Sequence, residues 1–129
     1  MYNSDWYNSL IKPFLAPPNS IFAPVWGILY VIIAISFFIF IFKKTDYDKR
    51  KGYIIFFAQI ILNLLWSPAF FIMQNMVLAL IIVIVMDILV FFNIKEFYRV
   101  SKISGLMLIP YFLWIIFATY LNIGYIYLN

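Results

Sequence analysis

The sequence predicts an all-α integral membrane protein, an antiparallel bundle of four transmembrane helices. Of its 129 residues, 67% are hydrophobic and 11% are charged, against roughly 45–50% and about 25% in soluble proteins. A water-soluble domain of this length would have to expose isoleucine and phenylalanine over much of its surface, which promotes aggregation. The apolar residues also gather into four long stretches. We therefore expect a protein whose solvent is lipid.

Each of the four apolar stretches is long enough to cross a bilayer; they are residues 22–42, 53–72, 76–94 and 105–127. About 20 helical residues span the ~30 Å hydrocarbon core, and a helix satisfies its own backbone hydrogen bonds in lipid. Short connections make neighbouring helices antiparallel. We expect one membrane domain over 1–129, with helices at 22–42, 53–72, 76–98 and 104–127.

The basic residues predict the orientation of this bundle. Lys12 alone lies on the side that holds both termini, whereas the opposite side holds Lys43, Lys44, Lys49, Arg50, Lys51, Lys95, Arg99 and Lys102. Cytoplasmic loops are enriched in Lys and Arg, so we expect both termini outside the cytoplasm, as in a bacterial inner membrane. Topology and contact with anionic lipid account for these charges, and no nucleic-acid partner is predicted.

The chain has no cysteine and no histidine. This excludes disulfides, metal sites built on those residues, axial histidine ligation of haem and triads based on histidine or cysteine. We expect no metal and no resident cofactor, and residue types alone assign no catalytic group.

The segment 1–21 precedes the first span and is predicted to lie along the outer interface. Trp6 and Tyr7 suit that position, and three prolines prevent a continuous helix; they are Pro13, Pro17 and Pro18. The segment is either a surface anchor or a lid over the mouth of the bundle.

Polar side chains at membrane depth indicate which faces point inward. In the second span, spacings of four, three and four place one set of side chains on a single helical face; they are Gln59, Asn63, Trp66 and Phe70. Buried amides need partners on other helices, so this face should point into the bundle. Pro68 should bend the end of this helix.

Asp87 lies past the middle of the third span. A carboxylate there costs roughly 2.5–3.5 kcal/mol on insertion scales, and no basic residue lies deep in any span. We expect an amide, a tyrosine hydroxyl or a tryptophan N–H from another helix as its partner. Two interpretations remain open: a proton relay or ligand contact, and a contact that only joins helices.

The first and last spans carry further aromatic residues. Trp26 and Tyr30 share a face of the first span, and most of a broad set should share one face of the last span: Pro110, Tyr111, Trp114, Ala118, Leu121, Asn122 and Tyr125. A flat apolar molecule would stack among these rings, with amides and hydroxyls orienting its polar edge. Alternatively, the rings only pack the helices together.

Motif blocks occur in order along nearly the whole chain. They are Trp6-Tyr7, Lys12-Pro13, Pro17-Pro18 and Pro24-Val25-Trp26-Gly27, then Gln59, Leu62-Asn63, Trp66, Pro68 and Asp87, then Pro110-Tyr111, Trp114, Phe117-Ala118-Thr119 and Leu121-Asn122. Together they resemble the translocator protein/tryptophan-rich sensory protein family. The resemblance implies a helical bundle with a pocket for porphyrins, and in many members for cholesterol and benzodiazepine-type drugs, capped by residues 6–21. It implies these pocket residues: Trp26, Tyr30, Asn63, Trp66, Trp114, Ala118 and Leu121.

Two departures from the family bear on function. The family has five spans, and the four found here match its second to fifth. Either the protein lacks the first helix, in which case a second copy of the chain, in a homodimer, could fill the gap, or the start codon is set too late and the helix is encoded upstream of Met1. Some bacterial relatives degrade protoporphyrin in light and use two tryptophans; one matches Trp114, but Leu15 stands at the position of the other.

We therefore expect a membrane protein that binds protoporphyrin IX-like tetrapyrroles and similar flat apolar ligands, for sensing, handling or transport. Three alternatives stay open. One is a light-dependent porphyrin-degrading enzyme, against which Leu15 argues. Another is a small proton-coupled multidrug exporter using Asp87, although such exporters carry their carboxylate in the first helix. The last is an assembly subunit whose aromatics only pack.

Overall fold

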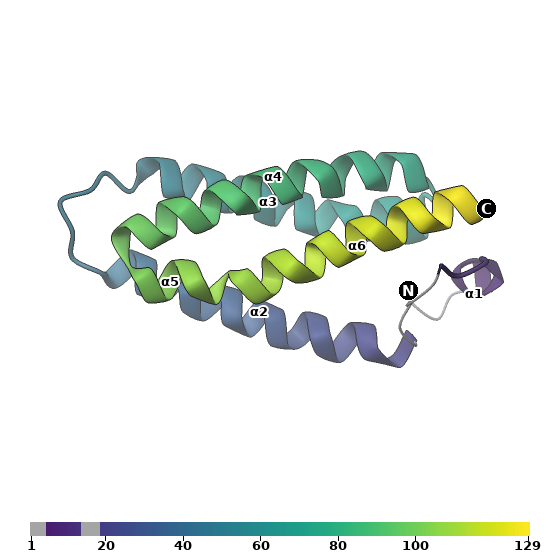
Figure 1. Cartoon of the computed structure of the whole chain (residues 1–129), viewed down its shortest axis with the longest axis horizontal. Helices are drawn as coiled ribbons and strands as arrows, with labels where there is room; N and C mark the ends of the chain where they lie inside the picture. Colours follow the sequence, from purple (N-terminus) through teal and green to yellow (C-terminus); the bar gives the residue numbers. More distant parts are fainter. Residues whose placement is uncertain (1–4, 14–18) are drawn as a thin grey trace.

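The computed structural model describes residues 5–13 and 19–129, and within these ranges the chain forms helices and no strand. Figure 1 shows the elements, which are α1 (Asp5–Ser9), α2 (Asn19–Phe42), α3 (Arg50–Ser67), a π-helical turn η1 (Pro68–Ile72), α4 (Met76–Val100), α5 (Lys102–Met107) and α6 (Ile109–Leu128).

Four stretches of the described chain are long and apolar enough to cross a membrane; they are Ala23–Phe42, Arg50–Ile72, Met76–Val100 and Lys102–Leu128. They run antiparallel to their sequence neighbours (Figure 1). Large aliphatic side chains cover their outer faces; Ile28, Ile54 and Leu64, for example, are each 62% exposed. In a water-soluble protein such a surface would aggregate, and in lipid it is the expected one. The predicted all-α membrane bundle is confirmed.

The ends of α4 and α5 follow from short polar side chains. The Asn75 side chain accepts a hydrogen bond from the Leu78 N–H over 3.0 Å, and this caps the start of α4. Ser101 has extended backbone angles (φ −146°, ψ 121°), which end α4, and its hydroxyl accepts from the Ser104 N–H to cap α5. Both are standard N-cap arrangements, and they fix the turns that make the neighbouring helices antiparallel.

The last span differs from the single helix predicted over 104–127. The structure has two helices there, α5 and α6, with Leu108 between them. Pro110 is the physical reason, because it has no N–H to donate to the preceding turn and its ring crowds that turn. Pro110 is also exposed, so it is not among the members of that set that face into the bundle. At Pro68, where the sequence predicts a bend, the second span changes from an α-helix to the π turn η1, in which the Met73 N–H donates to the Pro68 carbonyl over 2.9 Å.

α4 packs along α3 on one side and α6 on the other, while α2 lies against α5 (Figure 1). Stacked phenylalanines fill the end of the core near the 43–49 loop, with the ring centres of Phe40 and Phe97 4.1 Å apart. α2 and α5 are joined by a reciprocal pair, because the Ser36 and Ser104 hydroxyls each donate to the other residue's carbonyl over 2.7 Å. Eight of the nine basic residues lie at this same end, whereas Lys12 lies beside α1 at the other end.

Candidate functional site

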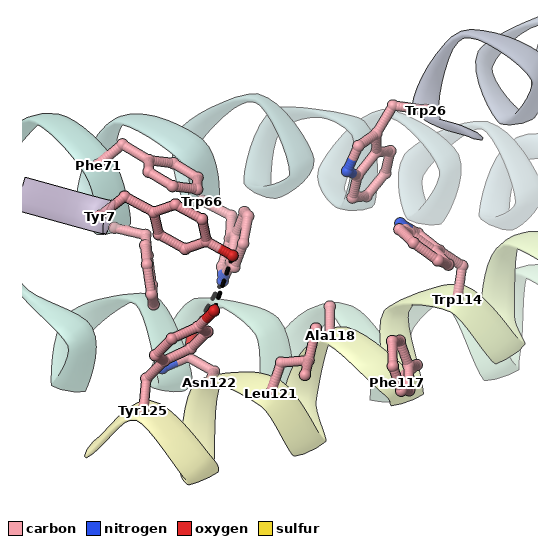
Figure 2. Close-up of a pocket in the computed structure, with 11 residues that line it drawn as sticks. Tyr7, Trp26, Trp66, Phe71, Trp114, Phe117, Ala118, Leu121, Asn122 and Tyr125 are labelled. Atoms are coloured by element: carbon pink, nitrogen blue, oxygen red, sulfur yellow. Dashed lines mark hydrogen bonds between the residues drawn. The ribbon is translucent and has the colours of Figure 1, made fainter. Parts of the chain in front are cut away.

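Two adjacent cavities lie in the half of the bundle near α1 and the C-terminal end of α6. The outer cavity, shown in Figure 2, is lined by Tyr7, Trp26, Trp66, Phe70, Phe71, Trp114, Phe117, Ala118, Leu121, Asn122 and Tyr125. The inner cavity is lined by Trp26, Tyr30, Asn63, Trp66, Ser67, Val83, Met86, Ile115 and Ala118. Trp26, Trp66 and Ala118 belong to both walls, so the two cavities form one site with an apolar outer part and a more polar inner end.

Three indole rings from three helices surround this site: Trp26 from α2, Trp66 from α3 and Trp114 from α6. The rings of Trp26 and Trp114 meet edge to face with centres 6.1 Å apart (Figure 2). Trp26 also stacks on Tyr30 at 5.7 Å. Ala118 is the small residue on the α6 wall, and its size leaves the space into which these rings face. Such flat, rigid walls suit a flat aromatic ligand, which would bury apolar surface and stack on the rings.

A chain of hydrogen bonds runs from the inner cavity into the core. The Tyr30 hydroxyl donates to Asn63 Oδ1 over 2.6 Å, and Asn63 Nδ2 donates to the Tyr111 hydroxyl over 2.9 Å. Tyr111 in turn donates to Gln59 Oε1 over 2.7 Å, and Gln59 Nε2 donates to Asn93 Oδ1 over 3.4 Å. The chain joins α2, α3, α6 and α4. It confirms that the Gln59–Asn63 face points into the bundle and finds partners on other helices, as buried amides require.

A second hydrogen-bonded group holds the wall of the outer cavity. The indole N–H of Trp66 donates to Asn122 Oδ1 over 3.1 Å, and Asn122 Nδ2 donates to the Met76 carbonyl over 2.9 Å. Asn122 therefore ties α3, α6 and the start of α4 together. The Trp66 ring cannot rotate without losing the bond, so its face stays turned towards the cavity and stacks on Phe70 at 5.4 Å.

Residues 5–13, which we call the lid, close the outer cavity. The Tyr7 side chain is buried and its hydroxyl lies 2.7 Å from that of Tyr125 (Figure 2). The Asn129 side chain forms two hydrogen bonds of 3.0 Å with the backbone of Ile11: its Oδ1 accepts from the Ile11 N–H, and its Nδ2 donates to the Ile11 carbonyl. Pro13 rests on Gly124, where a side chain would collide with its ring. The lid is thus attached to α6, which supports the lid interpretation over a simple surface anchor. Leu15, Pro17 and Pro18 lie outside the described residues.

Each cavity has a free volume of only about 20 Å³, which is enough for about one water molecule. A ligand with several fused rings cannot enter the site in this state. Access therefore requires the lid or the rings to move. The lid is held by hydrogen bonds to α6 and Asn129 and by ring contacts of Trp6 and Tyr7 with η1.

The structure brings together seven of the eight residues predicted for the site: Trp26, Tyr30, Asn63, Trp66, Trp114, Ala118 and Leu121 line one cavity or both. Asp87 lines neither. It is bound by the Thr119 hydroxyl, 2.7 Å from Asp87 Oδ2. We expected an amide, a tyrosine or a tryptophan as its partner, and this was wrong, because the helix rotation that brings Thr119 opposite Asp87 is set by packing. The bond joins α4 to α6, consistent with a helix-joining role.

Sequence reasoning missed several lining residues, among them Tyr7, Phe71, Phe117 and Met86. Tyr7 was assigned to the lid, but nothing in the sequence said that its ring turns inward rather than towards the interface. The other three are apolar, and apolar residues in a membrane span carry no signal that separates a cavity wall from a lipid-facing surface. Among the described residues, no cluster of three histidine, cysteine or acidic side chains could hold a metal ion.

The fold and the site define a multi-pass helical membrane protein with an aromatic-lined cavity near one end of its bundle. The chain belongs to the TspO/MBR family, whose pattern it matches over residues 1–128.

Curated relatives from distant organisms agree with this membership. The chain is 40% identical over 124 residues to the tryptophan-rich protein TspO of Archaeoglobus fulgidus, covering 96% of this chain and 80% of that protein. It is 35% identical over 127 residues to the tryptophan-rich protein TspO of Chlorobaculum tepidum, covering 96% and 79%. The human translocator protein is 30% identical over 120 residues, covering 91% of this chain and 70% of the human one.

Proposed function

We propose that the protein binds protoporphyrin IX-like tetrapyrroles and similar flat apolar ligands at the site of the two adjacent cavities, for sensing, handling or transport. The observation that carries this proposal is the arrangement of Trp26, Trp66 and Trp114, three indoles from three helices turned towards one enclosed space. Membership of the TspO/MBR family supports it. The site residues we assign are Trp26, Tyr30, Asn63, Trp66, Trp114, Ala118 and Leu121.

The binding energy would come from the apolar part of the ligand. Burying apolar surface contributes roughly 25 cal/mol per Å², and ring stacking adds about 0.5–1.5 kcal/mol for each well-placed pair. The ligand would displace the lid on entry, because the closed cavities hold about 20 Å³ each. Its polar edge would then meet Tyr30 and Asn63, the hydrogen-bonding groups at the inner end.

Quenching of tryptophan fluorescence by protoporphyrin IX in detergent tests the proposal. We expect saturable quenching that weakens in Trp114→Ala and Asn63→Leu, because each removes part of the cavity wall. Leu113→Ala is the matched control, since Leu113 neighbours Trp114 on α6 but is 61% exposed. Equal quenching curves for all four proteins would remove these residues from the site.

We further propose that both termini lie outside the cytoplasm, in a bacterial inner membrane. The eight basic residues of the opposite end support this orientation. Because the chain has no cysteine, single cysteines can be introduced without a background. A membrane-impermeant maleimide should label Gln74→Cys in spheroplasts and should reach Thr45→Cys only after lysis. The reverse pattern would invert the orientation.

The competing functions find less support in the geometry. A proton-coupled exporter needs its carboxylate in the path of the substrate, and Asp87 faces Thr119 outside both cavities. A light-dependent degrading enzyme would use Trp114, which does line the site, but its second tryptophan is replaced by Leu15.

A homodimer remains a proposal, to be tested by mass measurement in detergent.

A further inference from the structure

The inner cavity ends in a hydrogen-bond chain whose direction determines what a ligand meets there. Each hydroxyl has one hydrogen to donate. The Tyr111 hydrogen goes to Gln59 Oε1 at 2.7 Å, so towards Asn63 the Tyr111 oxygen can only accept. Asn63 must therefore turn its Nδ2 to Tyr111, at 2.9 Å.

The orientation of the Asn63 amide fixes the next bond in turn. With Nδ2 directed at Tyr111, its Oδ1 is directed at Tyr30 and accepts the Tyr30 hydrogen over 2.6 Å. What Tyr30 still offers the cavity is the lone pairs of its oxygen. At this point the cavity wall is a hydrogen-bond acceptor.

We propose that Gln59 is a positioning residue that sets the hydrogen-bond polarity of the site, so that the inner end prefers ligands with an N–H or O–H group at their edge over ligands with a carbonyl. Gln59 is fully buried and touches neither cavity. It acts through Tyr111 and Asn63 on Tyr30. The inference rests on the proposed binding site, and it specifies which polar group that site selects.

Removing the Gln59 acceptor reverses the donor–acceptor direction of the hydrogen bonds from Tyr111 to Tyr30. In Gln59→Leu the Tyr111 hydrogen would be left unpaired in the core if nothing else changed, which is costly. That part of the cost is avoided when Tyr111 donates to Asn63 Oδ1 instead and the amide turns over, while the loss of the Gln59 donor to Asn93 Oδ1 lowers stability without touching the cavity. Asn63 Nδ2 then donates to the Tyr30 oxygen, and the Tyr30 hydrogen is left to point into the cavity. The same wall becomes a donor, although no atom that lines it has been replaced.

The test uses carbazole and 9-fluorenone, two flat tricyclic molecules of matched size, of which the first carries an N–H donor and the second a carbonyl acceptor. Their apparent affinities are measured from the rise of the unfolding temperature of the detergent-solubilised full chain. The quantity compared between variants is the ratio of carbazole affinity to fluorenone affinity. Comparing this ratio between variants cancels the effects that the variants share, such as lid opening and hydrogen bonding of the Trp26 N–H to the fluorenone carbonyl.

We expect the ratio to fall by about 10-fold or more in Gln59→Leu, since one hydrogen bond is lost to carbazole and one gained by fluorenone, each worth about 3- to 10-fold. Gln59→Met removes the same acceptor with a different side chain, and we expect the same fall of the ratio in it. Ser36→Ala is the control: it removes a buried hydroxyl that binds Ser104 and lines neither cavity, so the ratio should not change.

An unchanged ratio in Gln59→Leu, or in Gln59→Met if Gln59→Leu does not fold, overturns the inference, as does failure of both tricycles to bind the wild type. Protoporphyrin quenching is measured on the same samples. Porphyrin binding with an unchanged ratio contradicts the role of Gln59 alone. A changed ratio without porphyrin binding supports that role and contradicts the proposed porphyrin ligand.

Discussion

The hydroxyl groups of Tyr7 and Tyr125 lie 2.7 Å apart although 118 positions separate the two residues in the chain. Tyr7 belongs to the lid and Tyr125 to the last helix, so this bond holds the outer cavity shut. Both rings also border Phe70, with centres 6.3 and 5.7 Å from it. The pair therefore connects lid, α6 and η1 at the wall of the outer cavity.

Tyr125→Phe should make the site easier to enter. The variant removes the hydroxyl bond, worth about 0.5–1.5 kcal/mol, and keeps the ring contacts. The open state should become about 2- to 10-fold more populated, and the association rate of protoporphyrin IX should rise by the same factor in stopped-flow fluorescence. Tyr127→Phe, at a ring that is 87% exposed, should leave the rate unchanged. A Tyr125→Phe rate equal to the wild type would show that the lid does not limit entry.

Asn122→Leu should destabilise the bundle by about 1–3 kcal/mol, because the buried Trp66 N–H loses its acceptor. The free energy of unfolding, measured by denaturant titration in mild detergent, checks this. Trp66→Phe and the double variant complete a double-mutant cycle, in which the coupling energy should be about 1 kcal/mol since the two side chains share a bond. Strictly additive effects would mean that the 3.1 Å contact between them contributes nothing to stability.

Alanine substitutions at two glycines should change the free energy of unfolding in opposite directions. At Gly27 an added Cβ would have nothing within 4 Å, whereas at Gly105 it would lie 2.7 Å from the backbone of Tyr98. Gly27→Ala should raise the free energy of unfolding by about 0.5–1 kcal/mol through helix propensity. Gly105→Ala should lower it by about 1–3 kcal/mol, because α5 has to move away from α4. Thermal unfolding of both variants in one detergent tests the pair, and a stabilising Gly105→Ala would contradict the close approach of these helices.

Asp87→Asn should keep the fold and raise the free energy of unfolding by about 1–2 kcal/mol. The Thr119 hydroxyl lies 2.7 Å from Asp87 Oδ2 and 2.9 Å from the Ile115 carbonyl, and its one hydrogen cannot serve both. An amide at position 87 donates to Thr119 and frees that hydrogen for Ile115, and it also costs less than a carboxylate in lipid. Glu96→Gln, which removes only partly exposed ion pairs, should change stability by less than about 1 kcal/mol. A lower unfolding temperature for Asp87→Asn would show that the carboxylate itself is required.

The candidate site could be predicted in part from the sequence. Trp66 and Asn63 follow from their spacing on one helical face, since a polar group in lipid has to turn towards the protein. Tyr30 and Trp26 follow from their shared face on the first span together with the family resemblance. The phenylalanine and methionine walls could not be found in this way, because in a membrane span an apolar residue is equally suited to a neighbouring helix and to an acyl chain.

The sequence by itself determined the class of protein, the four spans and the inward face of the second span. Each of these depends on the transfer of local chain segments from water to lipid, which length and composition describe. Only the tertiary structure decided that Tyr7 closes on Tyr125, that Thr119 binds Asp87 and that Gln59 reaches Tyr111. These pairings join distant segments, and they depend on how far each helix is rotated and tilted against its neighbours. Close packing of the whole bundle sets those angles, and no single segment specifies them.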